Sequence, residues 1–130
     1  MATFEKNIAG WNELLRSPKG AVFQHIDTLT KRVRRLAMIQ VGKKTRQLQR
    51  SIKASTTVGS RGGPVGTVLA DNEIALLHHR GTRRHQIRPK RQNTLRFPSR
   101  GKIVYAAVVN HPGTKANHFL TDPLRKVIDG

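Results

Sequence analysis

The side chains of this sequence that could bind a metal ion or move protons are six histidines. They are His25, His78, His79, His85, His111 and His118. Two histidines that share a metal ion on one helix commonly stand four residues apart, and no two of these six have that spacing. No Asp or Glu lies within five residues of His85 or His111 to complete a ligand set or orient the imidazole. We therefore expect no metal site and no cofactor.

Carboxylates and thiols, the other groups that commonly carry catalysis, are scarce. The chain has seven Asp and Glu residues and no cysteine, so it lacks thiolate nucleophiles, thiolate metal ligands and disulfides. Asp71 and Glu73 form a local pair, but capping of a following helix and interaction with its dipole explain both. The sequence therefore predicts a protein that is not an enzyme.

Closely spaced glycines between residues 59 and 66 could be mistaken for a phosphate-binding loop. Such a loop continues with Lys and Ser or Thr at the start of a helix. Here Thr67-Val68-Leu69 follows, which is typical of a strand. We interpret this segment as the turn of a β-hairpin.

Positive charge is the strongest feature of the composition. The chain has 25 Lys and Arg residues against seven Asp and Glu, a net charge of +18. Ten bases and no acid lie between Asp27 and Asp71, and the same holds between Glu73 and Asp122. An isolated domain with this charge repels itself, so we expect an acidic partner, either nucleic acid or the acidic face of another protein.

The densest basic segment runs from His78 to Arg91. Its Arg and Lys residues are Arg80, Arg83, Arg84, Arg88, Lys90 and Arg91. Gly81 and Pro89 make it a loop, and a loop suits phosphate contacts better than the reading of base edges by a helix. The scarcity of aromatic residues argues against stacking on single-stranded RNA. We predict that these six residues contact DNA or an acidic partner; the alternative is a loop that is merely solvated.

Two helices are predicted at the start of the chain. Phe4, Ile8, Trp11 and Leu15 share one face of a helix over residues 1–16. Ser17 is expected to cap a second helix, over residues 18–41, with Pro18 as its first residue; Gly42 is expected to end the helix or bend it. Its apolar seam is Val22, Ile26, Leu29, Val33, Leu36 and, as a polar last member, Gln40.

Strands and short helices follow. Alternating residues predict a hairpin, and the apolar run over residues 102–110 predicts a central strand. The remaining expectations are a short helix capped by Asp71 or Asn72 and closed by Gly81, strands over 85–88 and 94–97, a tight turn at 111–114, and a final helix from Asp122. We expect an α+β fold: one long helix packed on a mostly antiparallel sheet, with short helices including one at the C-terminus. The length fits one domain, 1–130, with 1–16 as a helical arm and 18–130 as the core. No apolar run is long enough to cross a membrane, and no signal peptide is apparent.

Several motifs in this order resemble a known family. They are Thr45-Arg46-Gln47-Leu48-Gln49-Arg50-Ser51-Ile52 after the long helix, Gly81-Thr82 after a short helix, and His111-Pro112-Gly113-Thr114 with Phe119-Leu120 near the end. Over residues 20–128 the chain resembles the neck, or tail-completion, protein family of long-tailed bacteriophages (siphophages) and their prophages. The chain departs from that family at Arg46, where a glycine is usual, at His79-Arg80, and at Asn117-His118.

The resemblance implies a structural virion protein made in the bacterial host cytoplasm. It would form a homo-oligomeric ring, six-fold rather than twelve-fold, at the head–tail interface, between a portal-side connector or stopper and the tail terminator or tail tube. Double-stranded DNA would pass through the ring without sequence-specific binding and without any membrane contact. The expected subunit or ring contacts are Arg61, His111, Lys115 and Phe119. Composition alone supports the alternative of a basic nucleic-acid-binding protein of the ribosome- or nucleoid-associated type. A small basic nuclease or toxin is disfavoured because no carboxylate–histidine centre is apparent.

Overall fold

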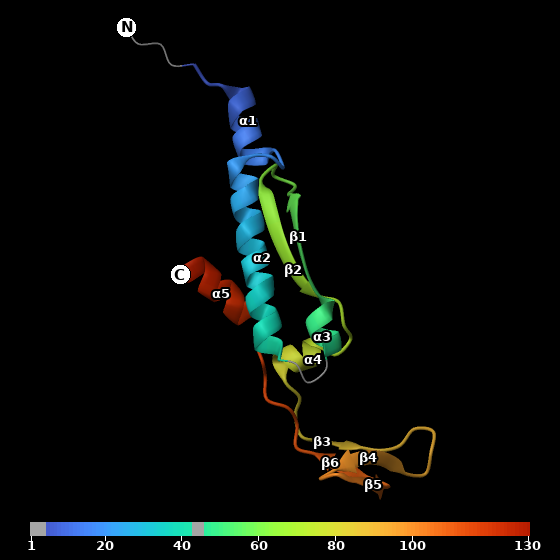
Figure 1. The fold of residues 1–130 in the computed structure, drawn as a ribbon. Coiled ribbons are helices and arrows are strands. Elements are labelled where there is room, and N and C mark those ends of the chain that lie inside the picture. The colour runs from blue at the N-terminus through green and yellow to red at the C-terminus, as the bar shows by residue number, and fades with distance from the viewer. Residues whose placement is uncertain (1–4, 43–45) are drawn as a thin grey trace. The chain divides into compact units, whose positions relative to one another are not determined.

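The computed structural model describes residues 5–42 and 46–130 (Figure 1). It confirms an α+β fold with a long bent helix, antiparallel strand pairs and a short C-terminal helix. Phe4, which the sequence places on the first helix, and Thr45 lie outside the described residues. The chain divides into two compact units. Unit 1 combines the chain up to Ala75 with His118–Gly130, and unit 2 is Leu76–Asn117. Unit 2 is thus inserted between the two stretches of chain that form unit 1. That the two units fold together as a single domain stays a prediction.

Unit 1 contains most of the helical structure. Its helices are α1 (Ile8–Arg16), α2 (Ala21–Val41), α3 (Arg46–Ser51) and α5 (Thr121–Asp129). The prediction that Ser17 caps the second helix is wrong. Its backbone N–H bonds to the Asn12 carbonyl and ends α1, and its backbone is extended, as sterically preferred before a proline. Gly20 precedes α2 instead and accepts the first helical hydrogen bond, from Gln24. Gly42, with φ +80°, ends α2 as predicted.

The predicted hairpin is confirmed as β1 (Ile52–Val58) and β2 (Pro64–Ala70), an antiparallel pair that packs on α2. Its turn is closed by hydrogen bonds from the Gly59 N–H to the Gly63 carbonyl and from the Gly62 N–H to the Gly59 carbonyl, so the glycine cluster is a hairpin turn. In β2, Gly66 lies directly against the Thr30 side chain of α2, and a Cβ there would collide with it. Close approach of the hairpin to α2 therefore requires glycine at this position.

The core of unit 1 lies where α2, α3 and the hairpin meet. Its buried members are Ala37, Leu48, Ile52, Ala75 and Phe119. Helix α3, which the sequence did not predict, contributes Leu48 to this core. Its first residue is Arg46, which stands where the resembled family usually has a glycine. On α2 the buried stripe is Thr30, Val33 and Ala37. Of the predicted seam, Val33 is buried and the other members are half-buried, because α2 divides its apolar surface between the hairpin and α5.

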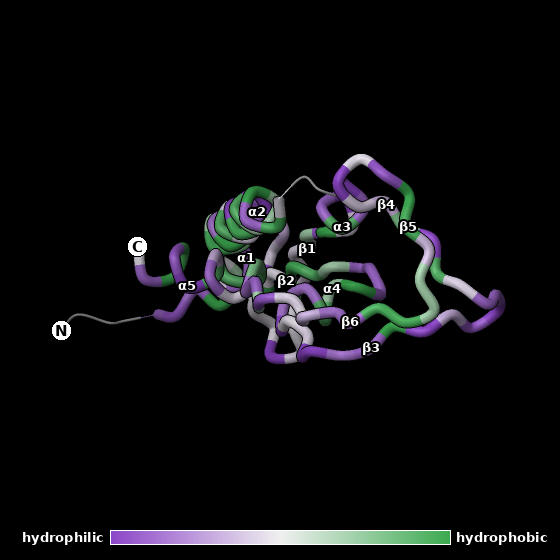
Figure 2. The backbone as a smooth tube through the Cα atoms, turned by 90° about the horizontal axis from the view of Figure 1, so that it is seen from below, coloured by the Kyte–Doolittle hydropathy of each residue, from purple (hydrophilic) through white to green (hydrophobic). Residues whose placement is uncertain are grey.

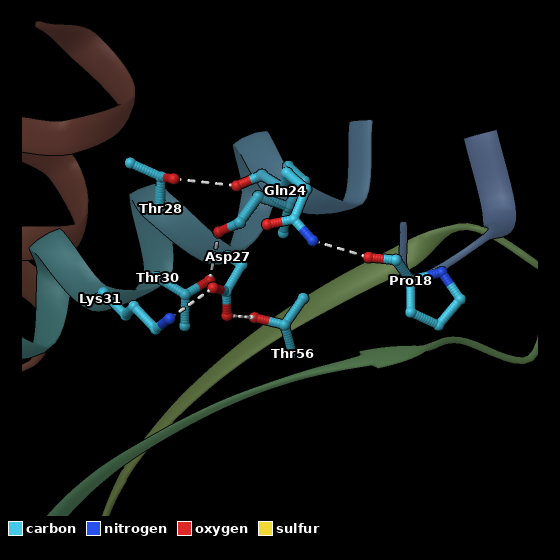
Figure 3. Close-up of polar contacts among 8 residues, drawn as sticks. Pro18, Gln24, Asp27, Thr28, Thr30, Lys31 and Thr56 are labelled. Carbon is cyan, nitrogen blue, oxygen red and sulfur yellow. Dashed lines mark hydrogen bonds and ion pairs between the residues drawn. The ribbon is translucent and has the colours of Figure 1, made fainter. Parts of the chain in front are cut away.

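Polar contacts also fasten α2 to β1 (Figure 3). The Thr56 hydroxyl donates to the Asp27 carboxylate at 2.9 Å, and the Lys31 ammonium lies 2.7 Å from the other carboxylate oxygen. The hydrogen bond from Lys31, followed by that from Thr56, lowers the pKa of Asp27 below its ordinary value. Arg34, which lies off the predicted seam, donates from Nε to the Ile52 carbonyl at 2.9 Å.

Unit 2 consists of short elements. They are most of α4 (Ala75–Arg80), then β3 (His85–Ile87), β4 (Leu95–Ser99), β5 (Lys102–Ala106) and β6 (Val109–His111). Strand β3 pairs with β6, and β4 pairs with β5, both antiparallel. Asn72 accepts a hydrogen bond from the Ile74 N–H in the turn just before α4, and Gly81 follows the helix with φ +75°, as predicted.

The prediction of one central strand over residues 102–110 is wrong. The run breaks at Ala107 and Val108 into β5 and β6, which belong to different strand pairs. It is also not central, since the side chains of Ile103 and Tyr105 are 52% and 64% exposed. The expectation of a mostly antiparallel sheet is met by three separate two-stranded ladders. Among the described residues, no helix is long and apolar enough to span a bilayer.

Candidate functional site

Two of the motifs behind the family resemblance, Gly81-Thr82 and His111-Pro112-Gly113-Thr114, pair with each other in unit 2. Thr82 and Thr114, 32 residues apart, exchange backbone hydrogen bonds of 3.0 and 3.1 Å, and their hydroxyl oxygens lie 3.0 Å apart. This Thr82–Thr114 bridge continues the β3–β6 ladder in the same register, in which His85 stands opposite His111. The prediction of a tight turn at 111–114 is therefore wrong. The backbone groups of Thr114 that a turn would bond locally are bonded to Thr82 instead.

Two glycines make this pairing sterically feasible. Gly81 has φ +75°, and a Cβ there would meet the Thr114 carbonyl oxygen and the Ala116 backbone. Gly113 has φ +88°, and a Cβ there would meet the carbonyl oxygen of Thr82. Each glycine thus adopts a conformation that other residues rarely take and lies against the opposite motif. The two motifs form one structural element in which both glycines are required.

Stacked histidines extend the same element. The rings of His85 and His111 have centroids 4.9 Å apart and an angle of 29° between their planes. His85 Nδ1 donates to the Arg83 carbonyl at 2.8 Å, since a carbonyl oxygen can only accept, whereas His111 Nδ1 accepts from the Gly113 N–H at 3.0 Å. The two imidazoles are therefore held as opposite tautomers by backbone groups. Within residues 5–42 and 46–130, no group of three or more His, Asp or Glu side chains is placed to hold a metal ion.

Unit 2 carries basic side chains and no acidic ones. The unit contains ten Lys and Arg residues and no Asp or Glu, so the acid-free stretch of the sequence coincides with a structural unit. These ten, all exposed, are Arg80, Arg83, Arg84, Arg88, Lys90, Arg91, Arg96, Arg100, Lys102 and Lys115. The ion pairs of Lys31 with Asp27 and of Lys53 with Asp71 lie in unit 1. No carboxylate side chain within unit 2 neutralises its cations.

The six residues predicted to contact DNA or a partner all lie on this surface. Arg80 is the last residue of α4, and Arg83 and Arg84 lie between the Thr82–Thr114 bridge and β3. Arg88 follows β3 and donates to the Gln86 side chain at 3.3 Å. Lys90 and Arg91 lie in the loop between β3 and β4, which is strongly hydrophilic in colour in Figure 2.

Sequence reasoning missed three further cations of the same surface. Arg96 lines a shallow hollow of about 390 Å³ together with Lys90 and Arg91. Arg100 lies in the turn between β4 and β5, and Lys102 is the first residue of β5. The signal that could have found them was the whole acid-free stretch rather than its densest part.

The four residues expected at a subunit interface lie in different places. Arg61 is exposed at the tip of the β1–β2 turn in unit 1, and Lys115 is exposed in unit 2, next to the Thr82–Thr114 bridge. His111 is half-buried under its stacking partner. Phe119 is fully buried in the core of unit 1, so its prediction as an interface residue is wrong. The physical reason is that an aromatic ring carries a large apolar area, and packing inside its own unit removes that area from water.

Taken together, unit 2 offers exposed guanidinium and ammonium groups on a small, hydrogen-bonded scaffold. Such groups form charge-assisted hydrogen bonds with phosphates and carboxylates. A scan against protein-family models, a search of curated proteins and a search of solved structures found no match to this chain.

Proposed function

We propose that this protein is a structural subunit of the neck of a tailed bacteriophage, a ring that joins the portal side of the head to the tail around the DNA channel. The observation that carries the proposal is the Thr82–Thr114 bridge. The Gly-Thr motif and the His-Pro-Gly-Thr motif, the second of which belongs to the most specific part of the family resemblance, form one paired element. Their glycines hold the two backbone conformations that the pairing requires. The two motifs therefore have a shared structural role, which supports the resemblance to the neck-protein family.

The charge of unit 2 suits such a position. In that position we expect the cations to meet acidic surfaces of the proteins above and below the ring and the phosphates of DNA in transit. Channel walls that bound DNA tightly would hinder its passage. We therefore assign part of the cationic surface to partner proteins and part to weak, sequence-independent contact with DNA.

One observation favours the second candidate, a nucleic-acid-binding protein: all ten cations of unit 2 are exposed and no acid accompanies them. Gel shifts with a salt titration separate the two functions. A dedicated binder holds duplex DNA or RNA as a free subunit, and its affinity falls steeply with salt because many counterions are released. A neck subunit binds duplex weakly on its own.

Antibody labelling of phage particles tests the neck assignment. Particles induced from the producing strain are incubated with gold-labelled antibody against this chain and imaged by electron microscopy. The gold should lie at the head–tail junction, while antibody against the major capsid protein labels heads as a control. Labelling elsewhere, or recovery of the chain only with ribosomes or nucleoid, would contradict the proposal.

A further inference from the structure

Helix α1 carries an apolar face that is largely exposed within residues 5–42 and 46–130. Ile8, Trp11, Leu14 and Leu15 fall on one side of the helix, with side chains 67%, 56%, 42% and 39% exposed. No residue of α1 is buried. Trp11 is the only tryptophan of the chain, and tryptophan is among the residue types enriched in interface hot spots. An exposed amphipathic helix with this residue at its centre indicates a docking element.

A second uncovered apolar surface lies elsewhere in unit 1, where α2, β2 and α5 meet. It is a groove of about 550 Å³, lined on α2 by Ile26, Leu29 and Val33 and on α5 by Leu124, Val127 and Ile128. The Ile128 side chain is 71% exposed and that of Leu124 is 46% exposed. The groove borders Ile26 to Val33, which is about two turns of α2, and α1 is itself nine residues, or about two and a half turns.

Charge identifies what can approach this groove. None of the residues that line it is charged, although the chain carries 25 Lys and Arg residues. The described arm, residues 5–16, balances Glu5 and Glu13 against Lys6 and Arg16. Two copies of a chain with net charge +18 repel each other over most of their surfaces. The groove lining has no charged residue, and the described arm has a net charge of zero. Repulsion between two copies is therefore weakest where the arm and the groove would meet.

We propose that α1 of one copy of this chain docks in the α2–β2–α5 groove of the next copy, so that copies join head to tail. No residue of α1 lines the groove of its own chain, so the donor and acceptor surfaces are distinct. Contacts between two different patches of identical subunits are heterologous, and they close into a ring when the rotation between subunits permits. The inference rests on the proposed function in that it names the self-association surface of the ring.

Because the chain has no cysteine, introduced cysteines report the contact without background. The full-length variant Leu14→Cys/Ile128→Cys, oxidised mildly, should give a ladder of disulfide-linked oligomers that collapses on reduction. Leu14→Cys/Ile39→Cys is the matched control. Ile39 is 70% exposed on α2, close to the 71% of Ile128, but does not line the groove. This control should stay largely free of the ladder.

Adding Trp11→Glu to the reporting pair supplies the second arm of the test. It should abolish the ladder and leave the circular dichroism spectrum and melting point unchanged, because α1 buries no residue in its own chain. Three results would overturn the proposal: a disulfide within single chains, a ladder of equal intensity with Ile39→Cys, or no ladder at all. None of these three results would contradict the neck assignment, which antibody labelling tests separately. Conversely, antibody labelling away from the neck would contradict the neck assignment but not a disulfide ladder that had been observed.

Discussion

Individual glycines show best how residue chemistry shapes this protein. Gly113, Gly81 and Gly101 all have positive φ, but only Gly113 and Gly81 also lie against a backbone carbonyl of another segment. Gly101, in the β4–β5 turn, has nothing within 4 Å of its missing side chain. The same backbone angle therefore serves a simple turn in one place and the pairing of two motifs in the other.

Gly113→Ala should destabilise unit 2 more than Gly101→Ala. Both changes place a side chain in the left-handed region, at a cost of about 1 kcal/mol or somewhat more. Gly113→Ala adds a collision with the Thr82 carbonyl, which we expect to raise the total to roughly 2–4 kcal/mol. Hydrogen exchange of the Thr114 amide measures this directly. Equal protection in the two variants would show that the Thr82–Thr114 bridge does not depend on Gly113.

Asp27 should make unit 1 sensitive to acid. Its pKa is lowered in the folded state by hydrogen bonds from Lys31 and Thr56, so it favours folding at pH values above the ordinary aspartate pKa of about 4. This contribution is lost as the pH falls through the folded-state pKa. Urea titrations of the parent and Asp27→Asn should therefore show the parent as the more stable at neutral pH, with a difference that shrinks on acidification. A difference independent of pH would contradict this role.

At the scale of elements, local sequence patterns located those that carry a distinctive signal. The hairpin was predicted because Ile52 to Val58 alternates and glycines follow; α5 was predicted from Asp122-Pro123 and the apolar residues behind it. The apolar run over 102–110 was read as one strand because nothing local marks a break at Ala107. Its division depends on the partners, β4 for one half and β3 for the other, and β3 lies some 24 residues away in the chain.

The candidate site followed the same rule. Its charge could be predicted from the sequence, because Arg and Lys side chains are mostly exposed whatever the rest of the chain does. The Thr82–Thr114 bridge could not, because Pro112-Gly113 is an equally good local signal for a turn and only the distant Thr82 supplies the competing hydrogen bonds. Phe119 was misplaced for a similar reason, since its burial depends on Ala37, Leu48 and Ile52 from elsewhere in the chain.

Packing of the hairpin on α2 should depend on Gly66. Gly66→Ala places a methyl group against the Thr30 side chain, so either the strand or the helix must shift, at a cost of about 1–3 kcal/mol. Gly63→Ala is the matched control in the same hairpin, because no atom lies within 4 Å of its missing Cβ and its φ is ordinary. The control should change the free energy of unfolding by less than about 1 kcal/mol. Chemical denaturation compares the two, and equal costs would contradict the close approach of β2 to α2.

At the scale of the whole molecule, the charge is divided between two kinds of unit. Unit 1 contains all seven acids, while unit 2 has ten bases and no acid. Exposed charges contribute little to folding stability, so natural selection for stability does not explain this division. It is explained if unit 2 faces phosphates or acidic partners.

Arg83→Ala/Arg84→Ala should separate assembly from folding. Both side chains are exposed, so the free energy of unfolding should change by less than about 0.5 kcal/mol. Phage carrying the variant should accumulate unjoined heads and tails or lose packaged DNA, and each lost phosphate contact should reduce the salt slope of DNA binding by about one. Arg32→Ala/Arg35→Ala removes two exposed arginines from α2 and serves as the charge-matched control. Normal phage yield from the first variant would mean that Arg83 and Arg84 are merely solvated.

The most direct test of the neck assignment is electron microscopy of particles made without this protein. When its gene is inactivated in the phage, DNA packaging and tail assembly should still be completed, but the filled heads and finished tails should remain unjoined. Purified chain added to the extract should then restore joined, infectious particles. Intact particles formed in its absence would contradict the account, and so would a block in an earlier step such as capsid assembly.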